Sequence, residues 1–354
     1  MRAVFAAFSG GSSNAPKRSK VQLRAQAYLR AFICSAVALE HVHLFLFLSP
    51  TPTYEFLKAQ LGSHSRVHLL PASGKSGGAR LQHARYVEYL TLLATAAANA
   101  TKIVLADATD VVFQADPFPL VEHGLYTAEE AASYTLGSHA ANAMWVRETY
   151  GDATLGSIAD RRVVCSGLTM GTARAIRSYL ELMASEGAKR LSAARLDELR
   201  RKHGRDLCRG FDQGIHNVLM RTTLGSTVTI LPSGLAALFN GNEMRCGSDV
   251  ELLNQTRLAY VARASSTAAP AAAAAAAAGT GAGVRGSLDV PPSIAVAHQY
   301  GRVRGRCQRA VRRSLTCRGG GRAQASVPGY CDVCARLWPE WLGDAENTWR
   351  AFAD

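Results

Sequence analysis

The sequence lacks an uninterrupted apolar run of membrane-spanning length. A helix that crosses a bilayer needs roughly 20 consecutive apolar residues. The nearest candidate, residues 27–48, is interrupted by charged and histidine side chains at Arg30, Glu40, His41 and His43. This stretch instead predicts a helix followed by a buried strand. We expect membrane association only through an anchor that lies outside this sequence.

A convincing signal peptide is also missing, because the apolar residues after Arg2 stop at Phe8, before a Gly/Ser stretch. Two N-x-T sequons, at Asn99 and Asn254, are nevertheless typical of proteins of the secretory pathway. We therefore expect the protein in the Golgi or in the lumen of the secretory pathway.

Acidic residues are absent between Arg302 and Arg322, where eight arginines supply much of the net charge of +13. Such a cluster is typical of a solvated basic surface, of a site that attracts a nucleotide or an anionic acceptor, or of a nucleic-acid-binding segment. No aromatic residues are interleaved with these arginines, so we expect no nucleic-acid partner.

Paired C-x-x-C motifs are lacking, since only Cys331 and Cys334 have that spacing among the eight cysteines. A structural zinc site usually has two such pairs. The four cysteines of the C-terminal tail therefore predict a small disulfide-tied lobe, with a zinc knot or free thiols as alternatives. These four are Cys307, Cys317, Cys331 and Cys334.

The composition is that of a globular protein, with 48% hydrophobic and 19% charged residues among 354. Predicted strands and helices alternate along the chain, which is typical of an α/β fold with a mostly parallel sheet. The predicted strands are 42–48, 66–70, 102–106, 162–165, 226–231 and 293–297, and the predicted helices are 82–98, 172–186 and 212–221.

Changes in composition divide the chain into five segments. We expect a flexible basic leader over residues 1–22 and a main domain over 23–261. An Ala/Gly-rich low-complexity insertion follows over 262–290, then a final segment of the main domain over 291–303, and an Arg- and Cys-rich extension over 304–354.

The strongest candidate site is the segment from Lys102 to Phe118, KIVLADATDVVFQADPF. A buried strand delivers Asp107 at its carboxyl end, where open parallel sheets bind ligands. If the chain turns there, Asp107 and Asp110 can converge on one hard cation, as a nucleotide diphosphate requires. The alternative is that both acids only end the strand and cap a turn. The following turn, Asp116 to Phe118, is expected to hold the next segment against the sheet.

This segment resembles the donor-site motif of the eukaryotic nucleotide-diphospho-sugar transferases of the GT-A type, in an algal or plant-like variant with D-x-x-D spacing. The resemblance implies a GT-A, Rossmann-like fold with a mostly parallel central sheet flanked by helices, and a metal-bound nucleotide-sugar donor. Of the two acids, Asp110 is slightly favoured as the direct metal ligand over Asp107.

Two further segments extend the resemblance. Residues 85–89, RYVEY, are similar to an R-Y-x-x-Y helix before the metal strand, and Arg85 is expected to reach the diphosphate or the donor-site acids. A surface or structural role for Arg85 is the alternative. Cys165, Ser166 and Gly167, followed by residues 171–172, resemble a strand-loop-helix segment beside the donor sugar, so Ser166 and Gly167 are expected to shape the donor pocket.

The remaining two motifs supply chemistry. Asp212 and Gln213 resemble a D-Q pair that holds sugar hydroxyls close to the reacting carbon, although Asp212 would also serve as a helix N-cap. His298 resembles the late histidine of the family, which completes the metal shell. Imidazole beside carboxylates favours Mn²⁺ over Mg²⁺. The sequence departs from the family at Gly301, where an Asp is expected.

The resemblance therefore implies a metal-dependent glycosyltransferase that moves a hexose or pentose from a nucleotide sugar, most plausibly a UDP-sugar, to a hydroxyl of a glycan or glycoprotein. It leans toward retention of the anomeric configuration, with Asp212 as a stabiliser rather than a general base. The rival hypothesis is a catalytically inactive GT-A-like scaffold that binds partners through its basic C-terminal surface.

Overall fold

The computed structural model describes most of the first 231 residues and three short segments beyond them. The described residues are 1–8, 29–30, 32–49, 52–72, 81–108, 111–113, 116–130, 134–204, 210–231, 238–240, 296–298 and 336–337. The arginine run, the Ala/Gly-rich insertion, the four C-terminal cysteines and Asp110 lie outside them.

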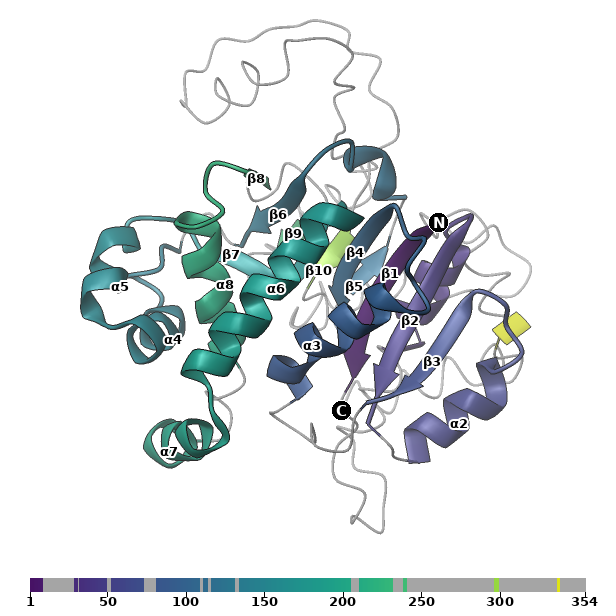
Figure 1. Ribbon diagram of the computed structural model, residues 1–354, viewed down its shortest axis with the longest axis horizontal. Helices are drawn as coiled ribbons and strands as arrows, with labels where there is room; N and C mark the ends of the chain where they lie inside the picture. The colour runs from purple at the N-terminus through teal and green to yellow at the C-terminus, as the bar shows by residue number, and fades with distance from the viewer. Residues whose placement is uncertain are drawn as a thin grey trace, which may run out of the picture.

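A seven-stranded sheet forms the centre of the protein (Figure 1). Its strand order is β3-β2-β1-β4-β7-β6-β8, and only β7 runs antiparallel to its neighbours. The prediction of an α/β fold with a mostly parallel sheet is confirmed. The strands are β1 (Arg2–Phe8), β2 (Val42–Leu48), β3 (Val67–Pro71), β4 (Lys102–Asp107), β6 (Leu125–Glu129), β7 (Val164–Thr172) and β8 (Val228–Leu231).

The first strand corrects one prediction from the sequence. Residues 1–22 were expected to form a flexible leader, but Arg2–Phe8 form β1, which is hydrogen-bonded to β2 on one side and to β4 on the other. Its small and aromatic side chains are buried because both faces of the strand are covered. Residues 9–22 of the expected leader lie outside the described residues.

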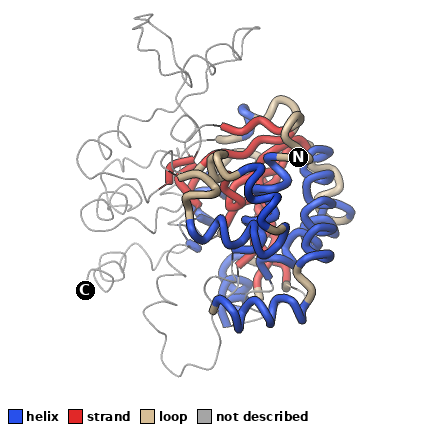
Figure 2. Tube along the Cα trace, turned by 90° about the vertical axis from the view of Figure 1, so that its left-hand side faces the viewer, coloured by secondary structure: helices blue, strands red, loops and turns tan. Residues whose placement is uncertain are grey.

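Helices cover both faces of the sheet, and Figure 2 shows the sheet turned by 90° with the helices packed around it. The helical residues 32–38 and α2 (Pro52–Leu61) contribute to the core on one face, while α3 (Leu81–Ala94), α6 (Ala173–Arg190) and α8 (Phe211–Arg221) contribute to the other. The chain runs from β1 outward to β3 and then returns across β1 to β4. Because parallel crossovers are almost always right-handed, this reversal moves the connecting helix to the opposite face.

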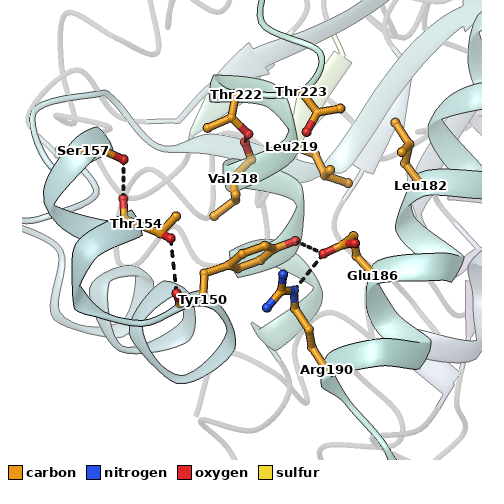
Figure 3. Close-up of a pocket in the computed structure, with 10 residues that line it drawn as sticks. All are labelled: Tyr150, Thr154, Ser157, Leu182, Glu186, Arg190, Val218, Leu219, Thr222 and Thr223. Atoms are coloured by element: carbon orange, nitrogen blue, oxygen red, sulfur yellow. Dashed lines mark hydrogen bonds and ion pairs between the residues drawn. The ribbon is translucent and has the colours of Figure 1, made fainter.

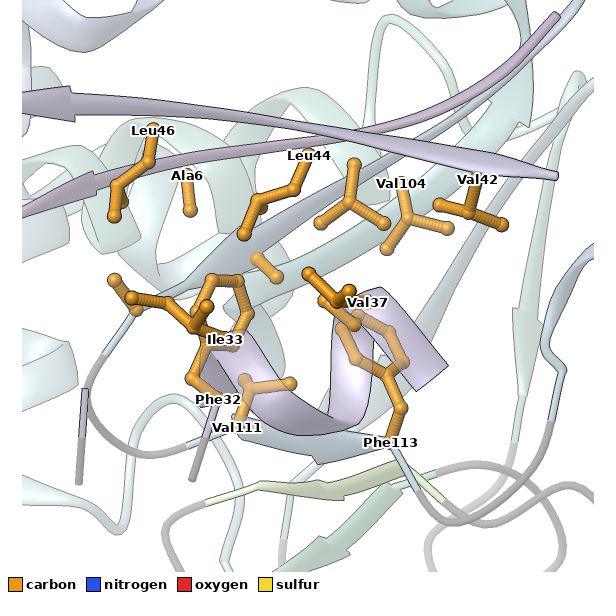
Figure 4. Packing of buried hydrophobic residues seen from close by; sticks show 14 of the residues in the cluster. Ala6, Phe32, Ile33, Val37, Val42, Leu44, Leu46, Val104, Val111 and Phe113 are labelled. Carbon is orange, nitrogen blue, oxygen red and sulfur yellow. The ribbon is translucent and has the colours of Figure 1, made fainter. Parts of the chain in front are cut away.

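Alternate residues of each strand fill two separate cores. Val4 and Ala6 of β1 belong to the core under residues 32–38, whereas Ala3 and Phe5 belong to the core under α3 and α6. Figure 4 shows the first core, where aromatic and branched side chains of helical residues 32–38 and of β5 (Val111–Phe113) meet alternate residues of β2 and β4. Each large side chain buried there stabilises the fold by about 1.5–3 kcal/mol.

Smaller elements flank the sheet. Three helices, α4 (Ala140–Tyr150), α5 (Asp152–Ile158) and α7 (Ala193–His203), extend beyond the strands at one side (Figure 1). A second sheet joins β5 (Val111–Phe113), β10 (Val296–His298) and β9 (Leu238–Asn240), with β10 in the middle. The predicted turn at Asp116 to Phe118, which follows β5, is confirmed, since the Phe118 N–H donates to Asp116 Oδ1 over 2.9 Å.

Strand β7 corrects a second expectation. The segment around Cys165 was predicted as a strand over 162–165 followed by a loop and a helix, but β7 continues through Thr172, where α6 begins. The pairing of β6 with β7 is irregular between Val164 and Thr169 of β7, because Thr127 pairs with Thr169 whereas Glu129 pairs with Val164. Such a bulge re-aims the strand locally and is common beside active sites.

Most other predicted elements formed within a few residues of their expected bounds. These include the predicted strands 42–48, 66–70, 102–106 and 226–231 and the predicted helices 82–98, 172–186 and 212–221. None of the helices in the described part of the chain combines the length and the hydrophobicity that a bilayer span requires.

Helix α8 is buried along nearly its whole length, between the sheet and α4. Close approach to α4 depends on Gly214, where an added Cβ would lie 2.9 Å from the backbone carbonyl carbon of Trp145. Contacts this short with backbone atoms require the helices to move apart.

We therefore expect Gly214→Ala to lower the free energy of unfolding by about 1–3 kcal/mol, the usual range for overpacking a core. Gly187 in α6 is the matched control, because an added Cβ meets no atom within 4 Å. Gly187→Ala should raise stability by up to about 1 kcal/mol, since alanine favours helices over glycine. Urea unfolding measures both; an equal response of the two variants would contradict the packing argument.

Candidate active site

The candidate site lies where the sheet changes its direction of winding. Strands β1 and β4 are neighbours, and Ala7 of β1 pairs with Asp107, the last residue of β4. The chain leaves β1 toward β2 on one side, whereas β4 lies on the other side of β1. In open α/β sheets such a reversal opens a crevice at the carboxyl ends of the strands, and ligands bind there.

The two-residue period of β4 directs Asp107 toward α3. Ile103 and Leu105 belong to the core that α3 covers, so Asp107 shares their face. Arg85 of α3 meets it there, with Nη1 donating to Asp107 Oδ1 over 2.6 Å. Arg85 thus reaches Asp107 as expected, and it is not a surface arginine, because it is only 7% exposed. The other alternative, a structural role for Arg85, is consistent with this burial and stays open.

The same guanidinium also holds Asp212 of α8. Arg85 Nη2 donates to Asp212 Oδ2 over 2.8 Å, and the Tyr86 hydroxyl donates to the same oxygen over 3.2 Å. The N-cap of α8 is Gly210, without a side-chain cap hydrogen bond, so the alternative of Asp212 as an N-cap is wrong. Arg85 thus joins two acids that are 105 positions apart in the sequence.

Exposure differs sharply along this network. The side chains of Arg85 and Asp212 are 9% and 6% exposed, whereas that of Asp107 is 34% exposed. The network joins one guanidinium to two carboxylates, and Asp107 is its most exposed member. A partly exposed carboxylate is a candidate ligand for a hard cation.

Burial and charge act against each other at Arg85. Burial lowers the pKa of a guanidinium, but the charges of the Asp107 and Asp212 carboxylates outweigh burial and raise the pKa of Arg85 well above its ordinary value. Burial also raises the pKa of the Tyr86 hydroxyl, which therefore stays protonated and remains a donor.

Two buried donors beside this network have no hydrogen-bond partner among the described residues. They are Arg85 Nε and the hydroxyl of Tyr89, one helical turn along α3. An unsatisfied buried polar group costs about 1–3 kcal/mol, and native proteins keep such groups mainly at functional sites or beside ordered water. These donors fit a site that takes an oxygen-rich ligand or ordered water.

Gln213 forms a second network with β7 and the end of β6. Its Oε1 accepts from the Ser166 backbone N–H over 2.8 Å and from Ser166 Oγ over 2.6 Å. Its Nε2 donates to Glu130 Oε1 over 2.6 Å. Gly167 lies in the same bulge, where its N–H donates to Cys165 Sγ over 3.2 Å. The structure therefore brings Ser166 and Gln213 together.

Glu130 is a site residue that sequence reasoning missed. It follows β6, and its backbone N–H donates to Val163 O over 2.8 Å. The available signal was an acid directly after an alternating segment, LYTAE, which is itself a strand.

The predicted metal ligands are only partly described. Asp110 and the side chain of His298 lie outside the described residues. The backbone of His298 is paired with Val111, the residue after Asp110, because β10 lies antiparallel to β5. The register thus places position 298 next to the D-x-x-D segment. Within the described residues, no three His, Cys, Asp or Glu side chains gather as a metal site.

His216 of α8 is buried and neutral. Its Nδ1 lies 2.9 Å from the Tyr179 hydroxyl, and its Nε2 lies 3.5 Å from Thr127 Oγ1. The Thr127 hydroxyl is directed at the carbonyl oxygens of Cys165 and Leu168, so it accepts from Nε2. Burial, followed by the charges of Arg85 and Arg221, lowers the pKa of His216 to about 3. This chain of hydrogen bonds satisfies carbonyl groups at the bulge of β7.

A shallow depression of about 540 Å³ lies elsewhere, among the helices (Figure 3). Tyr150 and Arg190 both bind Glu186 at its edge, through contacts of 2.9 and 2.7 Å. Arg190 also covers the Tyr150 ring, 3.6 Å from its centre. None of the residues predicted from the sequence lines this depression, and its ionic groups already bind one another.

Comparison with known proteins assigns no family: no family model matches this chain, and no curated protein matches it.

Loss of the Arg85 charge should destabilise the protein strongly. Arg85→Met leaves two carboxylates without their cation, and breaking a buried pair in this way costs about 3–5 kcal/mol. Arg147 is the matched control, because its ion pair with Asp152 over 2.6 Å is largely exposed. Arg147→Met should cost less than about 1 kcal/mol in urea unfolding. If Arg85→Met lowers the free energy of unfolding by as little as Arg147→Met does, the Arg85 network does not stabilise the fold.

Acid should weaken the fold through His216. Its pKa is lower in the folded protein than the ordinary value of 6.5, so the unfolded chain binds the proton first, and stability falls as the pH drops below 6.5. Between pH 7 and pH 5 this residue alone should account for a loss of about 2 kcal/mol. His216→Asn should reduce the pH-dependent loss by that amount in urea unfolding at the two pH values. If His216→Asn leaves the pH dependence of the free energy of unfolding unchanged, His216 is not the cause of the acid destabilisation.

Proposed function

We propose that this chain is a metal-dependent glycosyltransferase of the GT-A type. It moves a sugar from a nucleotide diphosphate sugar, most plausibly a UDP-sugar, to a hydroxyl of a glycan or glycoprotein. The observation that carries the proposal is the bridge of Arg85 between Asp107 and Asp212 at the switch point of the sheet. The seven-stranded, mostly parallel sheet with helices on both faces is the architecture that this assignment requires.

The metal would be held by Asp107, Asp110 and His298. Two carboxylates and one imidazole suit Mn²⁺, with Mg²⁺ as the alternative. The partly exposed Asp107 and the pairing of His298 with Val111 support this ligand set. A divalent cation, when bound, neutralises the diphosphate and stabilises the departing nucleotide.

Asp212 suits electrostatic stabilisation better than proton transfer. Among the described residues, both hydrogen bonds that it accepts go to Oδ2, which leaves Oδ1 for a ligand. The hydrogen bonds from Arg85 and Tyr86 hold this carboxylate in one orientation. This arrangement supports a retaining mechanism, in which Asp212 lies near the sugar and stabilises developing positive charge.

Deep burial of Asp212 and Gln213, the D-Q pair, favours a second candidate function, that of a catalytically inactive binding protein. Asp212 and Gln213 are only 4% and 8% exposed, and protein groups bind both ends of the Gln213 amide. A GT-A-like protein that binds a ligand or a partner without turning it over would also keep these residues inside. Turnover separates the two candidates.

The proposed location is the Golgi or the lumen of the secretory pathway. Asn99 of the first sequon is exposed in the turn after α3, where a glycan would be accommodated. Cys34 is disulfide-bonded, and disulfides persist mainly in oxidising compartments. Both observations support this location.

The proposal predicts nucleotide binding that depends on a divalent cation. UDP or a UDP-sugar at 100 times its Kd should stabilise the protein by about 2.7 kcal/mol in the presence of Mn²⁺, and EDTA should abolish the effect. Thermal shift across a panel of nucleotide sugars measures binding, and release of UDP measures turnover. Asp107→Asn and Asp110→Asn should lose both.

Asp160→Asn is the control, because this acid is exposed and lies outside the site. Binding without turnover would favour the inactive relative. If the wild-type protein binds no nucleotide with any divalent cation, the proposal fails.

A further inference from the structure

Glu130 lies at the same edge of the sheet as Asp107. Strands β4 and β6 are both antiparallel to β7, so they run in the same direction and their carboxyl ends share one edge. Asp107 ends β4, and Glu130 directly follows β6. The crevice edge thus carries one acid on each side of β7.

The Gln213 amide sets the direction of the Glu130 carboxylate. Gln213 Oε1 accepts two hydrogen bonds from Ser166, so its Nε2 must be the group that faces Glu130. The 2.6 Å bond from Nε2 to Glu130 Oε1 then orients the carboxylate. Reversing the amide would place two oxygens against each other.

The second oxygen of Glu130 is available. Among the described residues, Glu130 forms neither an ion pair nor a hydrogen bond through Oε2, and its side chain is half-buried. The adjacent acid differs, because Glu129 pairs with Arg221 over 3.0 Å. Within the described part of the chain, Glu129 is therefore paired with a cation, whereas Glu130 has no cationic partner and keeps one oxygen as a vacant acceptor.

We infer that Glu130 Oε2 binds a hydroxyl of the sugar substrate, with Gln213 as its positioning residue. This inference rests on the proposed function. A carboxylate without a bound cation repels a diphosphate, and the proposed cation site is at Asp107, so Glu130 faces the neutral part of the substrates rather than the nucleotide. The diphosphate then lies toward Asp107 and the sugar toward Glu130, which orients the donor along the edge of the sheet. The hydroxyl belongs to the donor sugar or to the acceptor.

Glu130→Gln isolates the vacant oxygen. The new amide keeps an oxygen that accepts from Gln213 Nε2, but it replaces Oε2 with an NH₂ group and removes the charge. Hydrogen bonds to charged groups are about twice as strong as neutral ones, so kcat/KM should fall about tenfold or more. Thermal shift with UDP and Mn²⁺ should be unchanged, because neither contacts Glu130.

Glu129→Gln is the matched control. It breaks the ion pair with Arg221 and should lower stability, while the KM values for donor and acceptor stay at wild-type values. In Glu130→Gln, a raised KM for the UDP-sugar with an unchanged KM for the acceptor assigns the hydroxyl to the donor. The reverse pattern assigns it to the acceptor, and either pattern supports the inference.

Two results would overturn the role of Glu130 without affecting the proposed function. In the first, the Glu130→Gln variant has wild-type kinetics. In the second, the Glu130→Gln variant no longer binds UDP with Mn²⁺. Absence of nucleotide binding by the wild-type protein would instead overturn the proposed function, and this inference with it. The binding and kinetic measurements thus distinguish the two failures.

Discussion

A single buried guanidinium connects the three elements that form the candidate site. Arg85 belongs to α3, Asp107 to β4 and Asp212 to α8, and the two ion pairs hold these elements in one arrangement. Burying the charges of Arg85 and Asp212 is expensive unless each charge is paired and hydrogen-bonded. The pairing also explains why α8 lies deep against the sheet with an acid in its first turn. The position of Gln213, and through it that of Glu130, follows from the position of α8.

The winding of the sheet decides where this connection forms. Because the chain reverses across β1, α3 lies on the face opposite α2 and reaches the carboxyl end of β4. The antiparallel β7 then places its bulge at the same edge, so that Ser166 meets Gln213. Polar groups of α3, β4, β7 and α8, which are far apart in the sequence, therefore converge at this edge. The helices thus pack on the sheet through apolar residues along most of their length and through ion pairs at the end of β4.

Sequence reasoning succeeded where a signal was local and periodic. The strand before Asp107 and the helix with Arg85 have clear hydrophobic patterns, and both formed. Strand β1 was missed because RAVFAAF is buried on both faces, so it lacks alternation, and its alanines are weak strand formers. Glu130 was missed for another reason: its partner Gln213 is 83 positions away, and no local pattern encodes that contact. The side-chain geometry of Asp110 and His298 remains a prediction from the sequence.

The local charge of the site runs against that of the whole chain. A net charge of +13 attracts anions over long distances, yet the three carboxylates of Asp107, Asp212 and Glu130 lie in the candidate site. Salt screens the field of the whole protein beyond about 8–10 Å, whereas partly buried charges act at short range with less screening. A nucleotide diphosphate would therefore be attracted by the protein as a whole but repelled at the carboxylates. In the proposed function a divalent cation would resolve this conflict, because it would bind the carboxylates and the diphosphate together.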